Sequence, residues 1–411
     1  MSIRSGRRGV LVIGSALTLA ACGGSSADNG VSPVAAAAGA DSPVAAAAGA
    51  DSTVPATEPP AVLVSGLDIA RGLALPAGPE PLVDLAEIRS GGPPPDGIPP
   101  IDEPNFVGAG DVDFLADNEP VLALDIDGDA RAYPVQILTW HEIVNDTVAG
   151  IPVAVTYCPL CNSAVAYDRR VGGRVVDFGT SGLLWNSALV MYDRQTETLW
   201  SHFTGQGIVG ELTGVELDTY PVATVSWEVW REANPDGSVL SRDTGFDREY
   251  GRNPYPGYDD VNGDPFLFEG EVDGRFTAMT RIVGIELDGE ALGVPLVTLQ
   301  EQRVVTAELA GTALVLFWAP GTASALDAGD IAAGDDVGAT GVFVPVAGDQ
   351  ELAFTASGDS FVDDETGSTW NLLGHAFDGP LAGSTLDPVE HVDTFWFAWS
   401  AFRPDTAIVD E

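Results

Sequence analysis

The feature that most constrains this chain is an internal duplication of its sequence. Four blocks of the first half recur in the same order in the second half, with small differences in length: 121–138 in 282–299, 149–168 in 310–327, 192–200 in 362–370 and 226–236 in 394–405. A repeat of this size indicates that each copy folds as one structural unit. Positions that both copies keep are expected to form the scaffold, whereas positions kept in one copy alone are candidates for chemistry.

Each copy is rich in strand and turn signals and poor in helix signals. Strand-like runs flank the turn signal Asp127-Gly128, which predicts a hairpin, and the apolar run 151–157 predicts a buried strand. Helices are expected over 135–144, after a proline, and over 226–233, where Ser226 caps the first turn. We therefore expect an α+β, β-rich fold, with two pseudo-symmetric repeat lobes of hairpins and a few short helices.

The repeat also predicts where the parts of the chain begin and end. The N-terminal lobe spans 101–236 and contains a CxxC pair, and the C-terminal lobe spans 279–411 and lacks cysteines. The stretch 237–278 has no counterpart in the repeat and is rich in Asp, Gly, Pro and aromatic residues. We expect it to form a connector between the lobes.

The N-terminal segment has the composition of a signal and a tether. Residues 1–21 combine a basic start with a short apolar run that ends in Leu-Ala-Ala before Cys22, which resembles a bacterial lipobox. Such a lipoprotein signal peptide makes Cys22 the lipidated first residue of an exported protein, held at the cell surface or on the periplasmic side of a membrane. Residues 22–100 contain the segment SPVAAAAGAD twice and a Pro/Gly cluster, so we expect a disordered tether.

The chain is strongly acidic, with a net charge of −43, and all 18 of its basic residues are arginines. A surface of this kind repels nucleic acids and anionic lipid headgroups. We therefore expect no nucleic-acid partner, and we expect contact with the membrane only through the lipid anchor.

The sharpest motif is the pair Cys158 and Cys161 at the end of a predicted strand. Two thiols at this spacing can close an inert disulfide, bind a soft transition metal such as copper or zinc, or carry out thiol redox chemistry. In the second copy, Ala319 and Thr322 stand at these two positions, so the turn forms without cysteines. A single CxxC pair excludes a closed all-cysteine zinc site within one chain.

Two histidines of the same copy are candidates to join the cysteines. His141 lies just before the cysteine-bearing strand, in a segment whose apolar positions recur in the second copy while its polar positions differ. It is a candidate metal ligand or proton carrier. His202, whose counterpart is Leu372, is a further candidate for a mixed set of thiolate and imidazole ligands.

Three blocks of the N-terminal copy resemble one bacterial protein family. The His-Glu-Ile-Val-Asn-Asp block at 141–146, the Tyr-Cys-Pro-Leu-Cys block at 157–161 and the Tyr-Asp-Arg…Leu-Trp block at 192–200 are similar to the family catalogued as domain of unknown function 3179. The resemblance is strong over about 101–285 and weaker over the remainder. It implies no particular activity.

Three functions of different classes are compatible with these residues. The first is an extracytoplasmic lipoprotein that binds a metal or carries out thiol redox chemistry through Cys158, Cys161 and His141. The second is a thiol-dependent enzyme in which His141 acts as the base for Cys158. The third is a surface scaffold or interaction protein whose cysteines form an inert disulfide.

We predict that the mature protein begins at Cys22 and carries a lipid there, because a lipobox directs cleavage immediately before its cysteine. Mass spectrometry of the protein from its native membrane measures the N-terminal peptide directly. A Cys22→Ala variant, which offers no thiol for attachment, is the matched control. An unmodified N-terminus elsewhere in the chain would contradict the prediction.

Overall fold

Short hairpins with tight turns build most of the structure, which is a computed structural model that describes residues 79–409. The hairpin predicted around Asp127-Gly128 is confirmed, and it joins β3 (Pro120–Ile126) to β4 (Asp129–Pro134). Both turn residues have positive φ angles, 52° and 83°. Asp-Gly is favoured there because positive φ at both turn positions matches the twist of the flanking strands.

The α-helices of the described residues have seven residues each: α2 (Val135–His141), α3 (Trp227–Ala233), α4 (Leu296–Gln302) and α5 (Trp396–Phe402). Ser226 caps α3 as predicted, because its hydroxyl oxygen accepts from the backbone N–H of Val229 at 3.3 Å. The first helix ends before the predicted residue 144, because Glu142 adopts a left-handed φ of 59° and Ile143 begins a strand. Short 3₁₀ turns are η1 (Leu85–Glu87), η2 (Ala109–Asp111) and η3 (Ile331–Ala333).

The N-terminal half adds the following strands: β1 (Ile88–Ser90), β2 (Phe106–Gly108), β5 (Ile143–Val148), β6 (Ile151–Cys158), β7 (Ser163–Asp168), β8 (Arg170–Val171), β9 (Arg174–Val175), β10 (Phe178–Trp185), β11 (Ala188–Asp193), β12 (Leu199–Ser201), β13 (Gly207–Val209), β14 (Thr219–Tyr220), β15 (Val222–Ser226) and β16 (Ser238–Leu240). They form sheets of order β15-β3-β4-β16-β2, β14-β7-β6-β5 and β1-β10-β11-β12-β13, and the ribbon β8-β9. The predicted buried strand over 151–157 is β6, whose residues from Val153 onward are buried.

The C-terminal half contains these strands: β17 (Arg281–Leu287), β18 (Glu290–Pro295), β19 (Val304–Leu309), β20 (Thr312–Ala319), β21 (Ala339–Val344), β22 (Val346–Ala347), β23 (Gln350–Glu351), β24 (Phe354–Ser357), β25 (Ser360–Asp363), β26 (Thr369–Trp370), β27 (Ala376–Asp378), β28 (Asp387–Pro388), β29 (Val392–Phe395) and β30 (Ala407–Ile408). Their sheets have the orders β29-β17-β18-β30, β28-β21-β20-β19 and β24-β25-β26-β27, and β22-β23 form a ribbon. Many small sheets and few helices confirm an α+β, β-rich fold.

The two halves follow the same strand order. In each, a hairpin, a seven-residue helix and a second hairpin come first, as β3-β4-α2-β5-β6 and as β17-β18-α4-β19-β20. Late in each half, a short strand pairs parallel to the hairpin, β16 with β4 and β30 with β18. A pseudo-symmetric superposition of the two lobes stays a prediction.

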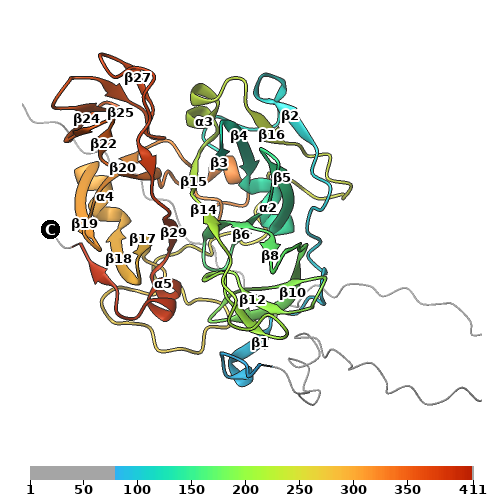
Figure 1. Cartoon of the computed structure of the whole chain (residues 1–411). Coiled ribbons are helices and arrows are strands. Elements are labelled where there is room, and N and C mark those ends of the chain that lie inside the picture. The colour runs from blue at the N-terminus through green and yellow to red at the C-terminus, as the bar shows by residue number, and fades with distance from the viewer. Residues whose placement is uncertain (1–78, 410–411) are drawn as a thin grey trace, which may run out of the picture. The chain divides into compact units, whose positions relative to one another are not determined.

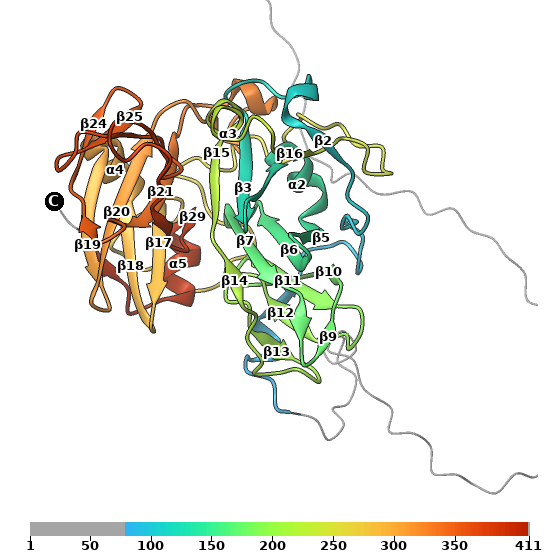
Figure 2. The ribbon, with the colours of Figure 1, turned by 45° about the horizontal axis from the view of Figure 1, so that its top comes forward.

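The two halves lie side by side in one compact unit (Figures 1 and 2). Two hydrophobic clusters join them. The first cluster combines Cys158 and Cys161 with Trp396 and Trp399 of α5. The second combines tryptophans of α3 with aromatic and aliphatic residues of the C-terminal sheets. The C-terminal half therefore contributes side chains directly to the core around the cysteines.

Two expected boundaries differ from the structure. Ile88–Ser90, expected within the tether, forms β1 and pairs with β10, because Leu85 and Ile88 pack against the apolar cluster of Val190 and Leu199. Ser238–Leu240, expected within the connector, forms β16 and pairs with β2 and β4. The signal, Cys22 and most of the tether lie outside the described residues.

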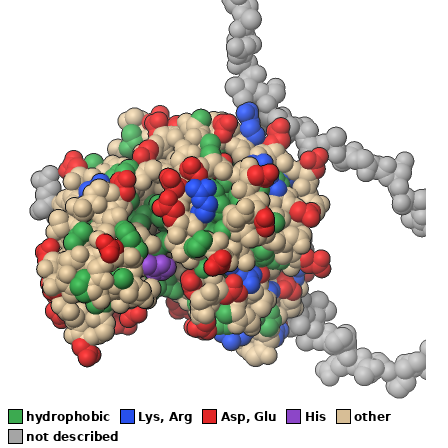
Figure 3. Space-filling view, turned by 90° about the horizontal axis from the view of Figure 1, so that it is seen from above, with side chains coloured by type: hydrophobic (Ala, Val, Ile, Leu, Met, Phe, Trp, Pro, Cys, Tyr) green, Lys and Arg blue, Asp and Glu red, His purple; other side chains and the backbone are tan. Residues whose placement is uncertain are grey.

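Acidic side chains are spread over the surface in Figure 3, and few basic ones stand among them. This agrees with the net charge of −43. Over residues 79–409, no helix is both long enough and apolar enough to cross a bilayer.

An aspartate braces the same hairpin in both halves. Asp193 accepts from the indole N–H of Trp200 at 2.9 Å and caps the turn between them. Asp363 likewise accepts from the indole N–H of Trp370 at 2.9 Å and from the backbone N–H of Thr366 at 2.6 Å. Trp200 and Trp370 are thus both buried with the indole N–H paired.

We predict that Asp363→Ala lowers the free energy of unfolding by about 2–4 kcal/mol, because it leaves the Trp370 indole and turn N–H groups buried without partners. Chemical denaturation of the purified protein measures the change. The exposed Asp349→Ala variant is the control and is expected to stay within about 0.5 kcal/mol of the parent. Equal stabilities for the two variants would refute the bracing role.

Candidate functional site

The turn between β6 and β7 positions both cysteines. Cys158 ends β6 and pairs with Ser163, the first residue of β7, while Cys161 lies in the turn between them. Asn162 closes the turn with a left-handed φ of 52°, a conformation that asparagine adopts more readily than most residues. Both cysteines are free thiols and are buried, so the inert disulfide is not formed in this structure.

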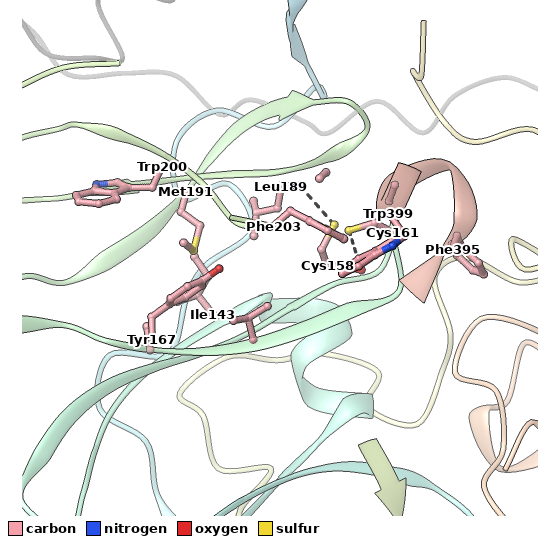
Figure 4. Close-up of a cluster of buried hydrophobic side chains, with 14 of the residues drawn as sticks. Ile143, Cys158, Cys161, Tyr167, Leu189, Met191, Trp200, Phe203, Phe395 and Trp399 are labelled. Carbon is pink, nitrogen blue, oxygen red and sulfur yellow. Dashed lines mark hydrogen bonds between the residues drawn. The ribbon is translucent and has the colours of Figure 1, made fainter. Parts of the chain in front are cut away.

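Leu189, in β11, connects Cys158 to His202 through its two backbone groups. Its N–H donates to the Sγ of Cys158 at 3.4 Å (Figure 4), and its carbonyl accepts from the N–H of His202 at 3.1 Å. The carbonyl of His202 accepts from the hydroxyl of Tyr167 at 2.5 Å. These contacts bring a histidine from the end of β12 to the cysteines at the end of β6.

Cys158, Cys161 and His202 form a compact group. Their ligand atoms all lie within 4.8 Å of one another, and no other trio of His, Cys, Asp or Glu side chains within residues 79–409 is gathered in this way. Bonds of about 2.0–2.3 Å from three ligand atoms to one trigonal ion place those atoms about 3.5–4.0 Å from one another. Shifts of about 1 Å at most would therefore let all three side chains reach one ion.

The ring of His202 is fully buried, and neither ring nitrogen has a hydrogen-bond partner among the described residues. Burial lowers the pKa of His202 to about 3, so the ring is neutral at pH 7 and one nitrogen carries a free lone pair. A buried polar group without a partner costs about 1–3 kcal/mol. The counterpart Leu372 is also buried and carries no such cost, which makes His202 a candidate ligand.

The pKa values of the two thiols are shifted in opposite directions. Burial raises the pKa of Cys158, but hydrogen bonds from the Cys161 thiol and from backbone N–H groups, that of Leu189 first, outweigh burial, and the net pKa is lowered. Burial, together with the neighbouring Cys158, raises the pKa of Cys161 well above its usual value. Cys158 is thus the more acidic thiol of the pair, and the sulfur of Cys161 lies 3.0 Å from the hydroxyl oxygen of Ser163.

The C-terminal half holds and covers this turn. The carbonyl of Cys161 accepts from the hydroxyl of Thr394 at 2.7 Å and from the N–H of Phe395 at 3.2 Å. Helix α5 places Trp399 beside the cysteines, where it also contacts Phe203 (Figure 4). The thiols are therefore enclosed by both copies of the repeat.

The structure gives His141 a different place from the one expected. Its Nδ1 is 2.6 Å from the carbonyl of Pro99, which accepts, so Nε2 accepts from the hydroxyl of Tyr250 at 2.6 Å. Burial lowers the pKa of His141, which fits this neutral tautomer. Both nitrogens of His141 are bonded elsewhere, and His141 is not in the group that Cys158, Cys161 and His202 form, so its role at the site stays a prediction.

Glu142 is a site residue that sequence reasoning did not select. It stands at the left-handed junction after α2 and is 7% exposed, and burial and then the nearby Cys158 raise its pKa well above the usual value. Its counterpart Arg303 occupies the same left-handed junction, with a φ of 66°. The repeat has the acidic Glu142 in its first copy and the basic Arg303 at the same place in its second copy. This difference is visible in the sequence and could have marked Glu142 as a candidate.

Comparison with known proteins identifies the family and nothing further. The sequence model of the family described as "Protein of unknown function (DUF3179)" matches residues 95–406, most of the chain and both of its halves. The resemblance noted in the sequence is thereby confirmed. No curated protein and no solved structure matches the chain.

We predict that His202→Leu raises the free energy of unfolding of the metal-free protein by about 1–3 kcal/mol, because it removes a buried ring without partners. The unfolded histidine takes up a proton below about pH 6.5 and the folded one only near its pKa of about 3. Relative to the variant, the free energy of unfolding of the parent should therefore fall by up to about 1.4 kcal/mol per pH unit as the pH falls through this window.

Denaturant titrations at several pH values measure both effects. His202→Gln, which keeps a buried polar group, is the control and should bring no gain at pH 7. A lower stability of His202→Leu at every pH would show that the ring is needed for packing.

Proposed function

The chain belongs to the DUF3179 family of proteins of unknown function, and we propose that it is an exported lipoprotein that binds a soft metal ion through Cys158, Cys161 and His202. We propose copper(I) as the preferred ion and zinc(II) as the weaker one. The lipobox at Cys22 supports the export part of the proposal, and the ligand group supports the metal part.

The observation that carries the proposal is the ring of His202, buried beside two thiols without any hydrogen-bond partner. Folded proteins pair almost all of their buried polar groups, so an unpaired imidazole aimed at two sulfurs requires an explanation. A metal ion supplies one, because neutral imidazole and thiolate are both strong ligands for soft and borderline ions. One such ion would bind all three side chains at once.

The number of ligands favours copper(I) over zinc(II). Structural zinc sites are almost always four-coordinate, and catalytic ones add a water to three protein ligands. Here three side chains are gathered and all three are buried, at 1% exposed for Cys158 and 0% for the other two. Soft thiolate ligands select copper(I), which does not require a fourth ligand.

Thiol chemistry without a metal is less well supported. The lowered pKa of Cys158 favours a thiolate nucleophile. However, the sulfur is covered by core residues of both halves, and His141, the expected base, is bonded to Pro99 and Tyr250 instead. A thiol-dependent enzyme would need both access and a base at this place.

We predict that the mature protein binds one copper(I) ion per chain and that His202→Gln weakens this binding by at least about 100-fold, because loss of even an outer-sphere partner costs 10–100-fold. Anaerobic competition with a chromophoric copper(I) chelator measures the affinity. Cys158→Ala and Cys161→Thr should abolish the one-to-one binding.

His375→Gln is the matched control, because this histidine lies in the C-terminal half, outside the ligand group. Its affinity should equal that of the parent. Zinc(II) titrated in the same way should bind more weakly. Copper binding that survives in His202→Gln, or a protein isolated with a Cys158–Cys161 disulfide and no affinity after reduction, would overturn the proposal.

A further inference from the structure

A cavity lies next to the cysteine-bearing turn, and neither cysteine lines it. Its volume is about 270 Å³, slightly below the roughly 300 Å³ at which typical small-molecule sites begin. Most of its lining is apolar, including Leu160, Leu183, Leu184 and Phe266. Leu160 and Leu189 belong to both places, since Leu160 lies in the CxxC turn and the N–H of Leu189 contacts Cys158.

The carboxyl group of Glu142 is one of the few polar groups that line this cavity. The residue is 7% exposed, and its carboxyl group makes no hydrogen bond to any other described residue. No basic side chain lines the cavity, so nothing there offsets a negative charge. Burial raises its pKa well above the usual value, and the group is therefore a carboxylic acid with an unused O–H donor.

Tyr255 supplies a second unused donor. Its ring lines the same cavity, and its backbone N–H donates to the side chain of Asn253 at 2.7 Å, which fixes the residue. The hydroxyl makes no hydrogen bond to a described residue, whereas the hydroxyl of the neighbouring Tyr258 donates to the carbonyl of Leu160 at 2.9 Å. Burial, and then the nearby Glu142, raise the pKa of Tyr255, so it also remains protonated.

We propose that this cavity binds a small, neutral, largely apolar carbonyl compound, whose oxygen accepts hydrogen bonds from the Glu142 carboxylic acid and the Tyr255 hydroxyl. Two O–H donors facing an apolar cavity suit an acceptor oxygen on an apolar body. A protonated carboxyl and a tyrosine together form a known type of site for a carbonyl oxygen. The site is separate from the three proposed metal ligands, and the proposal stands without them.

Charged ligands and pure hydrocarbons fit this cavity less well than a neutral carbonyl compound. A carboxylate ligand would face an acid in a lining without a basic side chain. An ammonium ligand would require Glu142 to ionise in an apolar environment. A pure hydrocarbon would fill the space but leave both donors unpaired.

Four probes of similar size and shape test the proposal on the full mature chain: acetophenone, isopropylbenzene, 1-phenylethylamine as its cation, and benzoate. Calorimetric titration at pH 7 should give the tightest binding for acetophenone, about ten-fold or more above isopropylbenzene, since each neutral hydrogen bond adds about 0.5–1.5 kcal/mol. The infrared carbonyl stretch of bound acetophenone should move to lower frequency than in an apolar solvent.

Variants identify the two donors. Tyr255→Phe removes one oxygen atom and should weaken acetophenone binding about three- to ten-fold and reverse part of the infrared shift, while isopropylbenzene binding stays unchanged. Glu142→Leu should act in the same way. Tyr220→Phe, outside this cavity, is the control and should bind all probes like the parent.

Several outcomes would overturn the proposal. They are equal binding of acetophenone and isopropylbenzene, tightest binding of the ammonium or the carboxylate, binding of no probe up to its solubility, and an infrared shift that Tyr255→Phe leaves unchanged. Cys158→Ala, which should abolish metal binding, is expected to keep acetophenone binding. A failure of one proposal is thus distinguishable from a failure of the other.

Discussion

The candidate site depends on the backbone of one residue in an inner strand of a sheet. Leu189 lies in β11, which has strands on both sides, and its N–H and carbonyl contact Cys158 and His202. Backbone groups of an inner strand move little relative to one another, because neighbouring strands restrain them on both sides. The sulfur and the imidazole are therefore held together by the sheet itself, and their proximity does not depend on the conformation of a flexible loop.

The two copies of the repeat contribute different residues to this site. The first copy supplies the thiols and the imidazole, whereas the second supplies Thr394, Phe395 and α5, which bond to the turn and cover it. Corresponding strands occur in the same order in both halves, and β1 and β2 extend two sheets of the first half. At the site itself the halves differ in a few side chains. Where the first copy has Cys158 and His202, the second has the packing residues Ala319 and Leu372.

Local signals in the sequence predicted local structure well. Asp127-Gly128 and Ser226 specify a turn and a helix start through contacts within a few residues. The partner of the cysteines was harder to predict, because it depends on which strands become neighbours. His141 is near Cys158 in sequence, yet its ring turns to Pro99 and Tyr250, while the distant His202 is brought in by β11 and β12.

Because α5 covers the site, it limits how fast an ion could enter or leave. The three side chains are walled in by aromatic rings from both halves, including Trp399 and Phe203. An ion that binds there would have to pass these covering side chains. Movement of α5 away from the turn, as in transient local unfolding, would open them, so the residence time of a bound ion would depend on that motion as well as on affinity.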